Sequence, residues 1–278
     1  MKVITTLGDM AEYILKLTQP MGLVPTMGSL HQGHLELINR SCSENVSTIV
    51  SIFVNPLQFL PNEDFDKYPR DLDRDLEILK KANVDTVFIP TVTEFYPSDF
   101  STYIDVEKFS KKLEGKSRPG HFRGVATVVG KLLILCRPDY AYFGQKDAQQ
   151  VLLIRQMNRD LNLGVSIVTV PTVRDVDGVA FSSRNKYLSN SERKAARVLY
   201  QSLLAVQEVK SNSVDDLKNV IFKSLTKEPL IQIDYVNISD PDTLEEISVV
   251  NKKCLVSIAV YVGKIRLIDN FVLDNMWR

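Results

Sequence analysis

Two of the three histidines in this chain lie three residues apart, in the segment PTMGSLHQGH at 25–34. A short apolar stretch precedes the segment, and the apolar spacing after His34 is typical of a helix. The first turn of a helix carries unpaired N–H groups and a partial positive charge, so it favours an anion. The imidazoles of His31 and His34 can add hydrogen bonds to phosphoryl oxygens. Histidines also occur in turns for structural reasons, but an HxGH turn between a strand and a helix favours phosphate binding.

A second polar cluster, FGQKD at 143–147, follows another short apolar strand pattern. Gly144 lets a ligand approach the backbone closely, because glycine has no side chain. Lys146 is a compact positive charge that suits phosphate, and the Asp147 carboxylate can accept hydrogen bonds from ribose hydroxyls. An ordinary polar turn explains the cluster equally well when it is taken alone.

Three further loops carry polar groups with a weaker functional signal. The segment FSSRN at 181–185 places two hydroxyls beside a guanidinium, which suits phosphate oxygens, although alone it favours a polar linker. The amides of NPLQF at 55–59 could orient a small polar substrate. The two arginines and the third histidine of RPGHFR at 118–123 could hold a carboxylate. Ordinary loop structure is the alternative in both of these loops.

Spacing excludes several familiar binding motifs. Residues 124–131 resemble a phosphate-binding loop, but five residues separate the two glycines, and Leu132 stands where that loop needs serine or threonine. The sequence has no GxGxxG fingerprint for a dinucleotide. The acidic stretch at 62–66 lacks the ligand spacing of a calcium loop. We therefore expect no metal site built by the protein alone.

The composition is that of a globular protein. The chain has 278 residues, of which 44% are hydrophobic and 24% are charged, so a sizeable core can form. Basic and acidic residues balance at 34 each, which leaves no basic excess for a nucleic acid. We expect no membrane span, because no stretch approaches the roughly 20 apolar residues required, and no signal peptide. The three cysteines are too widely spaced for a disulfide framework, which favours a cytoplasmic location.

Alternating strand and helix patterns must position the polar loops. Apolar, β-branched runs predict strands, and apolar residues at helical spacing predict the helices between them. The predicted strands are 22–26, 47–54, 86–89, 140–143 and 165–170, and the predicted helices are 8–17, 34–43, 70–82, 125–135 and 148–160. This alternation predicts an α/β fold with a parallel sheet. The polar loops should gather at the carboxyl ends of its strands, where ligands bind.

The C-terminal part of the chain has a different pattern. A capping box between Ser189 and Glu192 opens the first of two predicted helices. The predicted elements are helices at 189–210 and 214–225 and strands at 231–238, 254–260 and 264–273. The last two strands have no crossover helix between them. We therefore expect a smaller α+β domain at 177–278, after a first domain at 1–176.

Seven blocks of sequence, in order over nearly the whole chain, match the pattern of one known family. They are PTMGSLHQGH at 25–34, VNPLQF at 54–59, NEDFDKYPR at 62–70, RPGHFRGV at 118–125, FGQKDAQQ at 143–150, VRDVDG at 173–178 and SSRN at 182–185. One block would be weak, but seven in register are specific. The chain therefore resembles the pantothenate synthetase (pantoate–β-alanine ligase) family. Its HxGH turn is also similar to that of the wider nucleotidyltransferase superfamily.

The resemblance implies a Rossmann-like sheet domain with a C-terminal lid domain, and an ATP-dependent ligation in two steps. ATP and pantoate would form pantoyl adenylate and pyrophosphate, and β-alanine would then displace AMP to give pantothenate. Displacement at the α-phosphorus needs positioning and charge stabilisation rather than a covalent nucleophile. The resemblance further implies Mg²⁺ bound with ATP, where it would bridge phosphates. It also implies a homodimer.

The resemblance assigns most of the polar clusters to ATP. The implied ATP-binding residues are Met27, Gly28, Ser29, Leu30, His31, Gln32, Gly33, His34, Gly144, Gln145, Lys146, Asp147, Val173, Phe181, Ser182, Ser183 and Arg184. Of these, the implied catalytic residues are His34, His31, Lys146 and Arg184, with His34 as a proton donor. Lys146 would contact phosphate, Asp147 ribose and Val173 the adenine region.

The acid and amine substrates are assigned to other positions. Gln58 and Gln150 would hydrogen-bond pantoate, and Gln58 would also lie near β-alanine. Arg118 and His121 would lie near the substrate or the lid. Two residues depart from the family pattern. Phe181 stands where a smaller residue is common, and Ala148 stands where an aromatic residue is common.

Three rival functions are weaker. A transferase acting on a phosphorylated acceptor would need a cationic pocket, whereas the amides of Gln58 and Gln150 suit a hydroxy acid. The zero net charge disfavours a tRNA-binding protein related to the synthetases. A regulator that only binds nucleotide would not need the leaving-group donors His31, His34 and Lys146.

Overall fold

The chain forms two compact units. The computed structural model describes residues 1–61 and 63–274, so Asn62 of the 62–70 motif and residues 275–278 lie outside the described part. Unit 1 comprises Met1–Gly144 and Gln149–Val170, and unit 2 comprises Gln145–Ala148 and the chain from Pro171 onward. The division expected between 176 and 177 falls inside unit 2. The last strand of the parallel sheet, β6 (Ser166–Val170), ends before it and is followed by Pro171.

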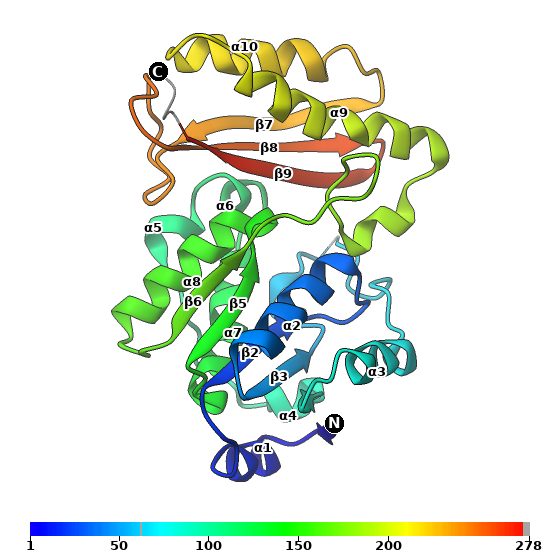
Figure 1. Cartoon of the computed structure of the whole chain (residues 1–278), viewed down its shortest axis with the longest axis vertical. Coiled ribbons are helices and arrows are strands. Elements are labelled where there is room, and N and C mark those ends of the chain that lie inside the picture. Colours follow the sequence, from blue (N-terminus) through cyan, green and yellow to red (C-terminus); the bar gives the residue numbers. More distant parts are fainter. Residues whose placement is uncertain (62, 275–278) are drawn as a thin grey trace. The chain divides into compact units, whose positions relative to one another are not determined.

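Unit 1 is built on a six-stranded parallel sheet with the order β1-β4-β3-β2-β5-β6, shown in Figure 1. The strands before β6 are β1 (Lys2–Ile4), β2 (Met21–Thr26), β3 (Ser47–Ile52), β4 (Thr86–Phe88) and β5 (Tyr140–Gly144). From β2 the chain proceeds through β3 to β4 on one side, and later through β5 to β6 on the other. The strand order therefore reverses between β2 and β5, which is where ligands bind in such sheets.

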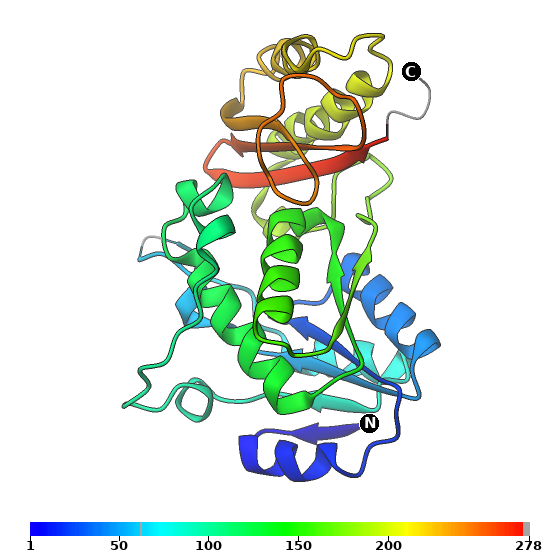
Figure 2. The same ribbon diagram turned by 90° about the vertical axis from the view of Figure 1, so that its left-hand side faces the viewer.

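Helices cover both faces of this sheet. They are α1 (Leu7–Ile14), α2 (Gln32–Glu44), α3 (Leu72–Lys81), α4 (Val92–Phe95), α5 (Glu107–Ser110), α6 (Glu114–Ser117), α7 (His121–Cys136) and α8 (Ala148–Asp160), with the 3₁₀ turns η1 (Pro56–Gln58) and η2 (Gln145–Asp147). The α2 helix packs on one face, and α7 and α8 lie on the other (Figure 2). Right-handed crossovers running in opposite directions from the reversal point require this placement.

The central strands of unit 1 are buried on both faces. All residues of β3 are buried, as the continuous β-branched run predicts. Val24 and Val50 of the sheet pack with Leu37 and Ile38 of α2 in one apolar cluster. Leu30, which lies between β2 and α2, belongs to the same cluster. Its burial anchors the turn before α2 to the core.

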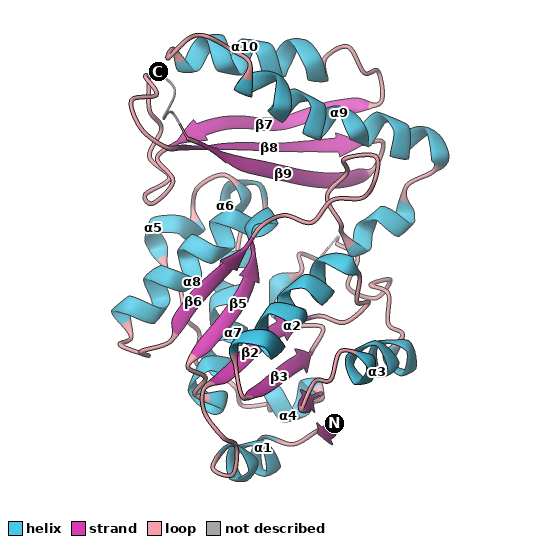
Figure 3. Cartoon of the chain, in the orientation of Figure 1, coloured by secondary structure: helices cyan, strands magenta, loops and turns pink. Residues whose placement is uncertain are grey.

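Unit 2 is an antiparallel sheet with two helices. The order of its strands is β7-β8-β9. Its elements are the 3₁₀ turn η3 (Ser183–Tyr187), α9 (Asn190–Gln207), α10 (Val214–Leu225), β7 (Ile231–Ser239), β8 (Cys254–Val262) and β9 (Ile265–Leu273). One apolar cluster joins the two helices to the sheet. Figure 3 shows this arrangement, in which the strands run without an intervening helix. The predicted α+β character is confirmed.

Most predicted elements are confirmed within a few residues. The α8 and α10 helices have the predicted bounds, and the capping box of Ser189 and Glu192 opens α9. The strand β1 and the four-residue helices α4, α5 and α6 were not predicted, because such short segments carry no hydrophobic period. None of the helices in the described ranges is both long and apolar enough to cross a bilayer.

Candidate active site

The turn between β2 and α2 carries the segment from Met27 to His34. Two of its residues have a left-handed backbone, Gly28 with φ +75° and Ser29 with φ +51°. A Cβ on Gly28 would lie 3.0 Å from Asp75 Oδ2 and 3.1 Å from Ile52 Cγ2. Both the positive φ and the close packing therefore favour glycine at this position.

A buried carboxylate holds this turn. Asp75 of α3 is 1% exposed, and its two oxygens accept hydrogen bonds from the backbone N–H groups of Ser29, at 2.7 Å, and Leu30, at 2.8 Å. The Thr26 hydroxyl accepts a third bond from the N–H of Gly28, at 3.1 Å. Asp75 was not predicted, because it lies 45 and 46 residues from its partners among other acidic residues of one helix.

The two histidines of the HxGH motif meet at the beginning of α2. His31 is the N-cap residue, and its backbone N–H donates to Nδ1 of His34 at 3.4 Å. The rings stack with centroids 3.9 Å apart and planes inclined by 22°. Both side chains are partly exposed. The structure therefore brings together two imidazoles and a helix N-terminus, which is the arrangement that the sequence predicts for an anion.

Gln58 lies in η1 after β3 and is held by its neighbours. The fully buried Asn55 donates from Nδ2 to Gln58 Oε1 at 3.1 Å, and Gln58 Nε2 approaches Met27 Sδ at 3.0 Å. Asn55 is itself fixed, since its Oδ1 accepts from the Tyr96 hydroxyl at 2.9 Å. Burial raises the pKa of Tyr96, so the hydroxyl stays protonated and can donate. Met27 and Gln58, both predicted site residues, are thus neighbours.

A second network reaches the backbone of Gln58. Arg118 donates from Nε and Nη2 to the two carboxylate oxygens of Glu63, each at 2.6 Å. Its Nη1 lies 3.0 Å from Nε2 of His121, and Nδ1 of His121 lies 2.8 Å from the Gln58 carbonyl oxygen. Because a guanidinium only donates, Nε2 must accept and Nδ1 must carry the proton. Arg118 and His121 therefore support Gln58.

Burial and the charge of Arg118 set the protonation of this network. Burial, followed by the nearby guanidinium, lowers the pKa of His121 to about 4, so the imidazole is neutral at neutral pH. Burial opposes ionisation of Glu63, but the hydrogen bond and charge of Arg118 outweigh it and lower the pKa of the carboxyl. The network thus holds one ion pair and one neutral histidine.

The two glutamines at the beginning of α8 differ in their surroundings. Gln149 is buried, and its amide bonds the carbonyls of Phe109 and Lys112, at 2.8 Å each, and the N–H of Glu114, at 3.1 Å. It therefore holds the segment around α5 and α6. Gln150 is half-buried. Gln149 therefore has a structural role, and the substrate role of Gln150 stays a prediction.

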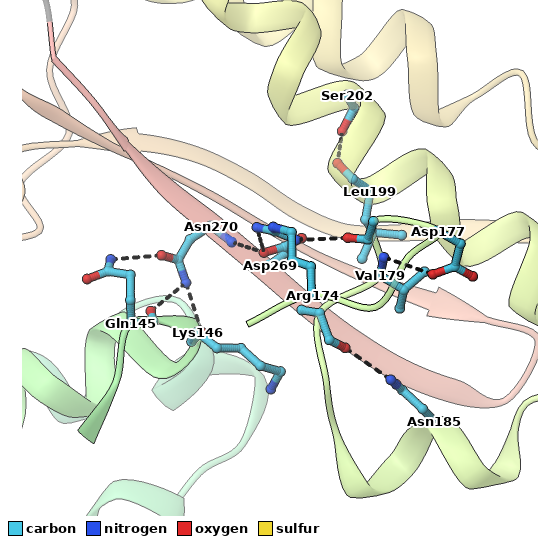
Figure 4. Close-up of polar contacts among 12 residues, drawn as sticks. Gln145, Lys146, Arg174, Asp177, Val179, Asn185, Leu199, Ser202, Asp269 and Asn270 are labelled. Carbon is cyan, nitrogen blue, oxygen red and sulfur yellow. Dashed lines mark hydrogen bonds and ion pairs between the residues drawn. The ribbon is translucent and has the colours of Figure 1, made fainter. Parts of the chain in front are cut away.

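In unit 2, the η2 turn carries Gln145, Lys146 and Asp147 directly after β5. The Lys146 ammonium lies 3.6 Å from the Asp147 carboxylate. The backbone carbonyls of Gln145 and Lys146 accept hydrogen bonds from the side chain of Asn270, in β9 (Figure 4). The turn and the strand belong to the same unit. Asn270 was not predicted, since it lies more than 120 residues away in the sequence.

The other predicted nucleotide residues of unit 2 lie in and after a short hairpin. The N–H of Phe181 donates to the carbonyl of Val173 at 3.0 Å, which brings these two residues side by side. Ser182 is the N-cap of η3, and its hydroxyl accepts from the N–H of Arg184 at 3.3 Å. Ser183 is buried, and Arg184 is partly exposed. Within the described residues, no three His, Cys, Asp or Glu side chains are grouped to hold a metal.

Known proteins of one family match this chain over nearly its whole length. A family model described as pantoate-beta-alanine ligase matches residues 2–272. A pantothenate synthetase of Thermosipho africanus is 51% identical over 279 residues, covering 98% of this chain and 100% of the relative. One from Roseiflexus sp. is 52% identical over 277 residues, covering 99% of this chain and 100% of the relative.

Solved structures agree with the sequences. The crystal structure of pantothenate synthetase from Thermus thermophilus has a TM-score of 0.94 at 45% identity, covering 98% of this chain and 99% of that one. The pantoate–β-alanine ligase of Francisella tularensis, complexed with β,γ-ATP and β-alanine, has a TM-score of 0.81 at 36% identity, covering 98% and 97%. Sequence and fold therefore agree, and the chain belongs to the pantoate–β-alanine ligase family.

Proposed function

We propose that this chain joins pantoate to β-alanine through a pantoyl-adenylate intermediate. In the first step a pantoate carboxylate oxygen attacks the α-phosphorus of ATP, and pyrophosphate leaves. In the second step the amine of β-alanine attacks the acyl carbon, AMP leaves, the amine loses a proton, and pantothenate forms. Membership of the family supports the overall reaction, and the Francisella relative is described in complex with β,γ-ATP and β-alanine.

The observation that carries the proposal is the pairing of His31 and His34 at the beginning of α2. Attack at the α-phosphorus adds negative charge to the phosphate and to the departing pyrophosphate. Two imidazole donors, the positive end of a helix dipole and rigid support from Asp75 suit that charge. His34 is proposed as the proton donor. Such a step needs oriented donors rather than a covalent nucleophile.

In unit 2, Lys146 is proposed to neutralise phosphate charge, with Asp147 bonding ribose. Val173 and Phe181 would contact the adenine region, and Arg184 would contact phosphate. Mg²⁺ is proposed to enter with ATP, held mainly by phosphate oxygens and water, and to neutralise phosphate charge. The donors His31, His34 and Lys146 fit that view, because they are groups that bind phosphate oxygens rather than a cluster of carboxylates.

Gln58 and Gln150 are proposed to bind pantoate. The bond from Asn55 to Gln58 Oε1 directs the Gln58 NH₂ group toward Met27 Sδ, and the second N–H of this group is the donor proposed for a ligand. Amide groups can bond both the hydroxyl and the carboxylate of a hydroxy acid without demanding a charged acceptor. Unit 2 is proposed to act as a lid and the protein to form a homodimer, as the family resemblance implies. A cytoplasmic location is proposed from the three widely spaced cysteines.

Pyrophosphate release tests the proposal. The protein is mixed with ATP and Mg²⁺, with β-alanine withheld, and release is followed with and without pantoate. We expect pyrophosphate release only with pantoate, limited to about one pyrophosphate per enzyme molecule if the adenylate stays bound. Pantothenate and AMP should form when β-alanine is added. ATP binding without pantoate-dependent release would contradict the adenylate step, and the assignments of Gln58 and Gln150 would then fail first.

A further inference from the structure

We propose that Asn270 is a positioning residue for Lys146. It acts by holding the backbone of η2, and the inference rests on the proposed function in assigning Lys146 to the phosphates of ATP. Asn270 lies in β9 of the C-terminal sheet and is 5% exposed. The proposal therefore gives a structural strand a defined part in nucleotide binding.

The contacts of Asn270 use its whole amide group. Nδ2 donates to the carbonyl oxygens of Gln145, at 3.1 Å, and Lys146, at 2.8 Å. Oδ1 accepts from Nε2 of Gln145 at 2.9 Å. Figure 4 shows these three bonds converging on the turn. Two consecutive carbonyls of a three-residue turn are thus fixed by one side chain.

The pattern of β9 explains why Asn270 is available for this role. Leu267 and Leu273 belong to the apolar cluster shared with the helices, and Phe271 packs against it. Because side chains alternate along a strand, Asn270 points to the opposite face of the sheet. An amide buried on that face needs hydrogen-bond partners. The η2 turn supplies them and covers the amide.

The neighbouring residue of β9 supports the second nucleotide segment. Asp269 accepts from both Nη atoms of Arg174, at 2.6 and 2.9 Å, and Arg174 packs over the ring of Tyr200 with 3.9 Å to its centroid. Arg174 lies in the hairpin that joins Val173 to Phe181. Asp269 also accepts from the N–H of Asn270 at 2.8 Å. The backbone of Asn270, which holds η2, is therefore itself held by Asp269.

Lys146 depends on this support because its side chain is long and flexible. The direction in which it leaves the backbone is set by the turn, and a shift of about 1 Å at a positioned group can cost about a hundredfold in rate. Asn270 supplies no atom to the nucleotide in this proposal. Its loss should therefore affect ATP and leave the binding of pantoate unchanged.

The test is a double-mutant cycle on pyrophosphate release. We expect Asn270→Ala to lower kcat/KM for ATP by about tenfold or more, the scale of the two hydrogen bonds lost to the η2 carbonyls, with the KM for pantoate unchanged. Lys146→Ala should lower kcat/KM for ATP further. The double variant should lose less than the product of the two single losses, because Asn270 acts on Lys146 through the η2 backbone; any loss beyond that of Lys146→Ala measures its effect on Asp147 in the same turn. Asn270→Ser, which keeps one donor, should show the same selectivity for ATP with a smaller loss.

Asn237→Ala is the matched control. Asn237 lies in the same row of the sheet, paired with Ser257, which pairs with Asn270, and it is similarly buried at 3%. Its Nδ2 donates to Glu246 rather than to η2. We expect this variant to lose stability in a urea titration, though less than Asn270→Ala because it gives up one side-chain hydrogen bond rather than three, and to keep its kcat/KM for ATP.

The outcomes separate this inference from the proposed function. Independent, multiplicative losses in the double variant would overturn the positioning role of Asn270 while leaving Lys146 in the site. An equal loss of kcat/KM for ATP in the Asn237 and Asn270 variants would show that Asn270 contributes only to general stability, which would overturn the positioning role as well. Full activity of Lys146→Ala would overturn both the assignment of Lys146 and the inference that depends on it.

Discussion

The HxGH turn of unit 1 and the η2 turn of unit 2 are both held by a buried side chain, but one support is a hydrogen-bond acceptor and the other a donor. Each presents side chains proposed to bind phosphate, and each is held by one buried side chain from a distant element. Asp75 is a carboxylate that accepts from two backbone N–H groups. Asn270 is an amide that donates to two backbone carbonyls.

The difference follows from the backbone groups that each turn leaves unpaired. In the HxGH turn the groups that face the supporting side chain are the N–H groups of Ser29 and Leu30, which precede the N-cap His31, and a carboxylate accepts from both. A 3₁₀ turn that follows a strand offers carbonyls in this protein, and only a donor can satisfy them. Hydrogen bonds to a charged group are roughly twice as strong as neutral ones. The HxGH turn should therefore depend more on its support than η2 does.

Removing a reacting group should have the largest effect in the HxGH turn. We expect His34→Ala to lower turnover by about 10²–10³-fold, as loss of a transition-state donor does, with little change in unfolding free energy. Stopped-flow or coupled assays of pyrophosphate release measure the loss. Asn39→Ala, at an exposed position of the same helix, should keep full turnover. Near-normal turnover of the His34 variant would remove this residue from the mechanism.

Removing Asp75, which supports the same turn, should have the second largest effect. Asp75→Ala leaves the N–H groups of Ser29 and Leu30 without their acceptor, so we expect the unfolding free energy to fall by roughly 2–4 kcal/mol. Turnover should fall by more than in Asn270→Ala. Urea unfolding and kcat/KM for ATP provide the two measurements, with Asp73→Ala on the exposed side of α3 as control. If Asp75→Ala is milder than Asn270→Ala, the ranking of the two supports is reversed.

The pantoate assignment should show a smaller and selective effect. Gln150→Ala should raise the KM for pantoate by about tenfold, the scale of one or two lost hydrogen bonds, and leave the KM for ATP unchanged. Gln149→Ala should instead destabilise the fold, because its amide bonds three backbone groups. Equal effects of Gln150→Ala on both substrates would contradict its assignment to pantoate.

The predicted effect that is smallest at neutral pH is a pH dependence of stability centred on His121. The pKa of His121 is lowered in the folded state to about 4 from an ordinary value of 6.5. Between pH 6.5 and about 4, His121 is protonated in the unfolded chain but not in the folded chain. The unfolding free energy therefore falls as pH is lowered through this range. His121→Gln removes this proton and should flatten the pH dependence of the unfolding free energy by up to about 1.4 kcal/mol per pH unit. An unchanged slope would show that His121 titrates normally in the folded protein.

The order of elements and the main motifs could be predicted because they are local. Hydrophobic periods of 2 and 3.6 residues identified the long helices and most strands, and α10 came out with its observed bounds. The HxGH spacing identified both imidazoles, because a strand, a turn and a helix lie next to one another in the chain. The edge strand β1 and the four-residue helices were missed, since they are held by contacts with the rest of the fold.

The sequence by itself determined the family of the chain and which side chains are proposed to carry the chemistry. Tertiary structure alone decided what holds those side chains in place. Asp75 and Asn270 resemble many other polar residues in the sequence, and only the packing of α3 and β9 brings them to their turns. It also decided that Gln145–Ala148, a continuation of β5, joins the C-terminal unit. The physical reason is that hydrogen bonds depend on distance in space, which for these pairs has no relation to distance along the chain.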